Sequence, residues 1–136
     1  MTGAPLGEFD VIARYFAGLG ARRGDVRLGI GDDAAVVEAP GVPLATALVT
    51  VIAPGPPRAA GAGAVDALAR ALVAAGAEPA WATLALTLSE IDPDWLAAFS
   101  TGLGERLEAH GMALIGGDTT RGPLAFTLVA HGATVP

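Results

Sequence analysis

The sequence predicts an α+β fold in which a mixed or antiparallel sheet carries helices on one face. Apolar residues recur at the helical period in some segments, whereas other segments are rich in Val, Ile and Thr. Helical and extended segments do not alternate strictly, which argues against an all-parallel sheet. The 136 residues suffice for one domain with its own core, and no internal repeat divides residues 1–136.

Three segments are expected to be helical. Residues 8–21 place Phe9, Ile12 and Phe16 on one stripe at steps of three and four. Residues 65–75 consist mainly of Ala and Leu, without internal Gly or Pro, and Gly76 supplies a C-terminal stop. A third helix opens at residues 92–94, with proline in its first turn, and runs to residue 110.

Five segments are expected to be strands because they are short, apolar and bounded by turn-forming residues. The residues between 54 and 63 contain several Gly and Pro and are predicted to form a loop. The predicted order is therefore α, β, β, α, β, α, β, β, with strands at residues 34–38, 46–53, 81–88, 112–115 and 124–134.

Composition excludes several classes of function. The chain has no cysteine, so disulfides and thiolate chemistry are absent. A net charge of −6 with eight Lys and Arg argues against a nucleic-acid partner. The longest apolar stretch, residues 44–53, is too short to span a membrane, which needs about 20 residues. The first ten residues lack the features of a signal peptide, so we expect a cytoplasmic protein.

Two glycine-rich acidic segments could carry chemistry. They are Gly29-Ile30-Gly31-Asp32-Asp33 and Ile115-Gly116-Gly117-Asp118-Thr119-Thr120, and both are predicted to be turns. Glycine lets a ligand approach the backbone, and carboxylate and hydroxyl oxygens are the donors that Mg²⁺ prefers. Neither segment matches a Walker or dinucleotide motif. Both segments could equally be plain turns, because Gly and Asp are common turn formers.

These segments belong to a longer series of blocks that resembles thiamine-monophosphate kinase. The blocks follow the order found in that family, and the last block is specific to it. They are residues 7–12 (GEFDVI), 28–35 (LGIGDDAA), 76–81 (GAEPAW), 83–88 (TLALTL) and 114–122 (LIGGDTTRG). The resemblance covers residues 7–133.

The resemblance implies the N-terminal, ATP- and Mg²⁺-binding half of a kinase of the aminoimidazole ribonucleotide synthetase superfamily. It implies a homodimer formed through the sheet, and a C-terminal half that this chain lacks. It assigns no catalytic side chain here. By the same resemblance, the metal ligands would be Asp32, Asp33 and Asp118, and Gly31, Gly116, Gly117 and Thr119 would lie near the phosphates.

The chain departs from the family pattern at two segments. Aligning Gly55 with the family's glycine puts Thr50 where a metal-binding aspartate belongs, and Ala71 replaces a second aspartate. Arg70 arrives beside that second position, where its guanidinium could pair with the remaining carboxylates. We therefore expect Mg²⁺ and ATP to bind weakly or not at all. Two hypotheses stay open: a degenerate module that is inactive alone, or an active kinase half that needs a separate C-terminal half.

Overall fold

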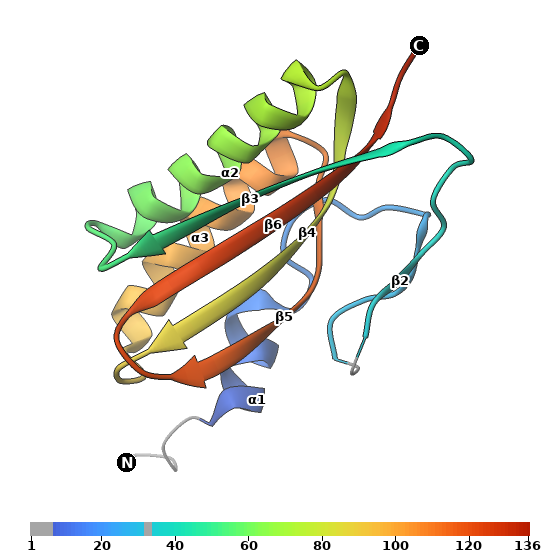
Figure 1. Cartoon of the computed structure of the whole chain (residues 1–136). Helices are drawn as coiled ribbons and strands as arrows, with labels where there is room; N and C mark the ends of the chain where they lie inside the picture. The colour runs from blue at the N-terminus through green and yellow to red at the C-terminus, as the bar shows by residue number, and fades with distance from the viewer. Residues whose placement is uncertain (1–6, 32–33) are drawn as a thin grey trace.

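A four-stranded mixed sheet forms the centre of the computed structural model, which describes residues 7–31 and 34–136. The strand order is β3-β6-β4-β5, with β4 and β5 parallel and the other neighbours antiparallel. The predicted α+β class, with a mixed sheet, is confirmed (Figure 1). The strands are β3 (Leu44–Ile52), β4 (Ala77–Leu88), β5 (Ala113–Arg121) and β6 (Ala125–Thr134).

Helices α2 (Pro57–Ala74) and α3 (Pro93–Ala109) lie together on one face of this sheet (Figure 1). Alternate strand residues such as Leu84, Leu86 and Leu128 point towards the helices and are buried. Phe99 of α3 lies at the centre, with its ring centroid 4.9 Å from that of Phe126. No helix in the described part of the chain is long and apolar enough to cross a membrane.

The expected loop at residues 54–63 is wrong, because α2 begins at Pro57. Proline is well suited to the first helical position, and one of the glycines that follow, Gly61, is needed for helix packing. A Cβ on Gly61 would lie 2.8 Å from the carbonyl oxygen of Phe99, and one on Gly102 would lie 2.1 Å from that of Arg58. Gly61, one of the glycines that suggested a loop, therefore lets α2 and α3 approach closely, as does Gly102 of α3.

The N-terminal helix is shorter than expected. It comprises α1 (Glu8–Val11) and a π-helical segment, η1 (Ile12–Phe16), and Ala17 is already extended. The predicted apolar stripe is confirmed only in part, because Phe16 is buried in the core but Ile12 is only partly buried, and the buried Val11 did not belong to that stripe. The first expected strand appears only as β2 (Val36–Val37), and it pairs with β1 (Val26–Leu28), which the sequence did not predict.

A second, smaller core lies on the sheet face away from the helices. Trp81, Ala113 and Ile115 project from β4 and β5, and Val26 of β1 and Val37 of β2 pack against them. The β1–β2 ribbon therefore covers one end of this face. We call the remainder the open face; it carries the exposed residues Leu48 and Ile52 of β3.

Candidate functional site

The structure brings the two glycine-rich segments together beside the β5 edge of the sheet. Gly20 forms an isolated antiparallel bridge with Ala113, so the chain segment before β1 lies alongside the start of β5. Gly29 and Ile30 from the first segment and Ile115 from the second line the same pocket. A Cβ on Gly116 would lie 3.9 Å from the Cβ of Ala35, just beyond the first segment.

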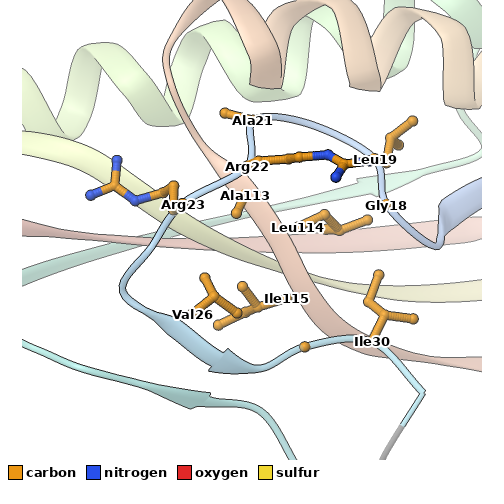
Figure 2. A pocket seen from close by; sticks show the side chains of 11 residues that line it. Gly18, Leu19, Ala21, Arg22, Arg23, Val26, Ile30, Ala113, Leu114 and Ile115 are labelled. Atoms are coloured by element: carbon orange, nitrogen blue, oxygen red, sulfur yellow. The ribbon is translucent and has the colours of Figure 1, made fainter.

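The pocket between these segments has a volume of about 320 Å³. Its walls are mainly apolar, and Figure 2 shows Val26 and Ile115 close together on one side, with Ile30 beyond them. Arg22 extends towards Leu19, whereas Arg23 points the opposite way (Figure 2). An apolar hollow with the cation of Arg22 at its margin suits a ligand that has both a ring and an anionic group.

The second segment is a strand and not the expected turn. Residues 116–121 continue β5 in register with β4, so their side chains alternate between the two faces. Asp118 and Thr120 are exposed on the open face, and Thr120 shares a 3.0 Å hydroxyl contact with Thr87. The Thr119 side chain is buried towards the helices, and its backbone N–H donates to Asp118 Oδ1 at 3.0 Å. The exposed hydroxyl at this site is therefore that of Thr120.

Gly116 and Gly117, which are adjacent in this segment, differ in whether the fold requires glycine. Gly117 has φ +156°, and a Cβ there would lie 1.9 Å from the Leu84 carbonyl oxygen, so the sheet itself requires glycine. Gly116 meets nothing closer than 3.9 Å. The fold does not require glycine at position 116, so packing alone does not account for this residue.

Asp118 is the one predicted metal ligand that the structure describes, because Asp32 and Asp33 lie outside the described residues. Within residues 7–31 and 34–136, no group of three His, Cys, Asp or Glu side chains could hold a metal ion. Asp118 and Thr120 do offer carboxylate and hydroxyl oxygens on one face of β5, which is the donor chemistry that Mg²⁺ takes.

The structure contradicts the predicted pairing of Arg70 with Asp118. Arg70 is exposed on α2, which packs on the helix side of the sheet, whereas Asp118 projects from the open face. The side chain of Ala71, the neighbouring position, also belongs to this helix layer. The sheet therefore separates Arg70 from Asp118.

Thr50 shares the open face with Asp118 but lies far from it. The cross-strand register runs from Thr50 through Thr127 and Ala85 to Asp118. Three strand spacings separate the two ends of this row, or about 14 Å. Thr50 instead shares a 2.8 Å hydroxyl contact with Thr127. A carboxylate at position 50 would therefore not join Asp118 on one ion within a single chain.

Sequence reasoning missed a polar cluster that adjoins the first segment. The Asp25 carboxylate accepts hydrogen bonds from Arg23 Nε at 3.1 Å, Arg23 Nη2 at 2.9 Å and Trp81 Nε1 at 3.1 Å. The Arg23 hydrogen bonds are the main reason that the pKa of Asp25 is lowered from its usual value. Nothing in the local sequence links residue 25 with residue 81, so the signal exists only in three dimensions.

The fold and site define an α+β domain whose glycine-rich, acidic segments meet at one end of its sheet. The family model described as "AIR synthase related protein, N-terminal domain" matches residues 31–134. The chain therefore belongs to this family.

The curated relatives that the chain matches include thiamine-monophosphate kinases. The chain is 48% identical to the thiamine-monophosphate kinase of Escherichia coli (strain K12) over 133 residues, and 39% identical to that of Haemophilus influenzae over 134 residues. Both matches cover 93% of this chain but 41% of the relative. The chain thus spans less than half the length of the thiamine-monophosphate kinases that it matches.

Solved structures agree with this assignment. The thiamine-monophosphate kinase of Stenotrophomonas maltophilia K279a matches with a TM-score of 0.74 and 40% identity, over 81% of this chain and 37% of that one. The hydrogenase maturation protein HypE of E. coli matches with a TM-score of 0.69 and 22% identity, over 91% of this chain and 41% of that one, which shows a shared fold alone.

Proposed function

We propose that this chain is the N-terminal, nucleotide-binding half of a thiamine-monophosphate kinase, and that it has no turnover by itself. The observation that carries the proposal is the meeting of residues 29–30 with residues 115–116 beside one pocket or at its margin. The 48% identity to a named thiamine-monophosphate kinase supports the choice of substrate. The relatives' remaining length supports the need for a second half.

The residues present suit phosphoryl chemistry by binding and positioning. Phosphoryl transfer depends mainly on orienting the phosphates and neutralising their charge, and Mg²⁺ supplies that neutralisation when bound. Asp118 would hold the metal from the open face of β5, with the Thr120 hydroxyl beside it. The backbone at Gly116 would let a phosphate approach, and the apolar pocket would exclude water from the base. Because Thr50 and Ala71 stand where the family has metal-binding aspartates, the expected affinity for Mg²⁺ and ATP is weak.

An assay of ATP consumption with thiamine monophosphate tests this proposal. We expect no turnover above a no-enzyme control for the chain alone. Adding the purified C-terminal half of the E. coli relative decides between the two hypotheses. Turnover that appears with this half and disappears with Asp118→Asn supports an active kinase half, whereas persistent inactivity supports a degenerate module. Turnover by the chain alone would contradict the proposal.

We also propose a homodimer through the open face, in a cytoplasmic protein. Leu48 and Ile52 are 67% and 77% exposed and project from the same side of β3. The uncharged strand β3 also forms an edge of the sheet, with nothing paired beyond it in the described chain. Large exposed apolar side chains beside an uncharged edge strand favour contact with a second copy.

A further inference from the structure

The buried indole of Trp81 has a hydrogen-bond partner that plays no part in the proposed nucleotide site. Trp81 is 2% exposed, and its indole N–H needs an acceptor because an unpaired buried donor is costly. Asp25 supplies this acceptor from 56 residues earlier in the chain, at 3.1 Å. No described buried side-chain donor or acceptor is left unpaired, so this contact is part of a complete network.

Arg23 completes the network from the other side. Its guanidinium donates two hydrogen bonds to Asp25, donates from Nη1 to the Gly111 carbonyl at 3.0 Å, and lies 5.8 Å from the Trp81 ring centroid. The Asp25 carbonyl in turn accepts from the Glu38 N–H at 2.6 Å. Residues on both sides of the first glycine-rich segment are thereby tied to one residue, Asp25, through its carboxylate and its backbone carbonyl.

We propose that Asp25 is a positioning residue that fixes the segment bearing Gly29, Ile30 and Gly31 against the start of β5. Three residues separate Asp25 from Gly29, and they form the short strand β1. Val26, the next residue, packs on Trp81 and Ile115 in the second core. The Asp25 clamp, defined as Arg23, Asp25 and Trp81, therefore determines how closely the two segments meet at the pocket.

The expected effect on MgATP binding rests on the proposed function, whereas the expected effect on hydrogen exchange does not. Hydrogen exchange of the amides at residues 26–31 reports on the clamp without any ligand. Trp81 emission reports on the indole environment, with Trp95 left as the second tryptophan. In Asp25→Asn we expect at least tenfold faster exchange at these amides, an altered Trp81 emission and at least fivefold weaker MgATP binding.

Matched variants separate positioning from general stability. Glu105→Gln removes the exposed Arg58–Glu105 ion pair on the helix layer and should change none of these readouts. Trp81→Phe keeps an aromatic ring but loses the indole donor, and should reproduce part of the faster exchange. Asp25→Glu retains the charge and should restore exchange partly towards wild type, which a volume defect would not do.

The outcomes are distinct. Unchanged exchange at residues 26–31 in Asp25→Asn overturns the inference, whether or not MgATP binds. Faster exchange with unchanged MgATP affinity also overturns it, because the segment would then be positioned without consequence for the nucleotide. If the wild type binds no MgATP while exchange rises as expected, the proposed nucleotide function fails and the clamp's structural role stands on the exchange data.

Discussion

Adjacent glycines in one motif can be present for different reasons, and Gly116 and Gly117 show this at the scale of single residues. Gly117 is fixed by the sheet, because a side chain there would collide with the backbone of β4. Gly116 has room for a methyl group. A glycine that packing does not require, beside a carboxylate and a pocket, is the better candidate for a ligand-contacting position.

The two alanine variants should separate these roles. Gly117→Ala would place a Cβ 1.9 Å from the Leu84 carbonyl oxygen, so we expect a loss of about 3 kcal/mol in unfolding free energy. Gly116→Ala should keep the wild-type stability within about 0.5 kcal/mol and weaken MgATP binding. Urea denaturation of both variants checks the first expectation. Equal stability of the two variants would contradict this interpretation of the motif.

Asp66 joins the two helices and should make their packing sensitive to acid. Its Oδ1 accepts from Arg106 Nε at 2.8 Å and contacts His110 Nε2 at 2.9 Å. Burial raises the pKa of Asp66, but the hydrogen bonds from Arg106 and His110 outweigh burial and lower the pKa overall. A lowered folded-state pKa means that this stabilisation is present above the unfolded value of about 4 and is lost as the pH falls below it.

We therefore expect Asp66→Asn to reduce the pH dependence of stability between pH 6 and pH 3. The effect should be at most about 1 kcal/mol, because the ion pair is partly solvent-screened. Denaturant midpoints for the wild type and the variant across this range provide the measurement. A wild type and variant that lose stability in parallel would show that Asp66 does not contribute to acid sensitivity.

At the scale of elements, the packing of the helix layer depends on the close approach of α2 and α3. Gly61 and Gly102 allow backbone contact between the helices, and a Cβ on Gly102 would lie 2.1 Å from the Arg58 carbonyl oxygen. Gly63 lies on the same helix as Gly61 but is exposed and meets nothing within 4 Å. Gly61 and Gly102 are therefore required for the packing of the two helices, whereas Gly63 is not.

Alanine at these positions should have effects of opposite sign. Gly102→Ala should lower the unfolding free energy by about 3 kcal/mol, because the helices must separate. Gly63→Ala should raise it by up to about 1 kcal/mol through helix propensity. Thermal melts of the two variants beside the wild type give the comparison. A stabilised Gly102→Ala variant would mean that α2 and α3 do not cross as described.

The class of fold followed from periodicity and composition, but several element boundaries did not. Short apolar segments rich in Val, Ile and Thr predicted β3 and β6, each of which the structure confirms as a strand. Pro57 and Gly61 suggested a loop, since local composition cannot reveal that a neighbouring helix requires glycine. Residues 116–121 suggested a turn for the same reason, because β4 supplies the pairing that extends β5.

The candidate site was predictable only in part. The glycine-rich segments indicated the meeting point, and the structure places residues 29–30 and 115–116 beside one pocket or its margin. The pairing of Arg70 with Asp118 was wrong, because a helix pattern does not say which face of the sheet that helix covers. The Asp25 clamp was missed, because it joins residues from β4 and the chain before β1.

At the scale of the whole molecule, the open face should hold two copies together. Ile52→Asp would place a charge in the proposed interface. At micromolar concentration we expect light scattering to give a monomer for this variant and a dimer for the wild type. Val73→Asp, on the outer surface of α2, is a matched control because Val73 is 62% exposed on the helix side. A monomeric wild type, or a monomer from Val73→Asp as well, would contradict this interface.

The central claim is that the paired segments beside β5 form a weak nucleotide site. The most direct test is a thermal melt with and without 10 mM Mg²⁺ and ATP, a concentration for which a Kd of about 1 mM gives roughly 1.4 kcal/mol. We predict a rise of about 3–5 °C in the wild-type midpoint and a clearly smaller rise in Asp118→Asn. An unchanged wild-type midpoint, or an equal rise in Asp118→Asn, would contradict the claim.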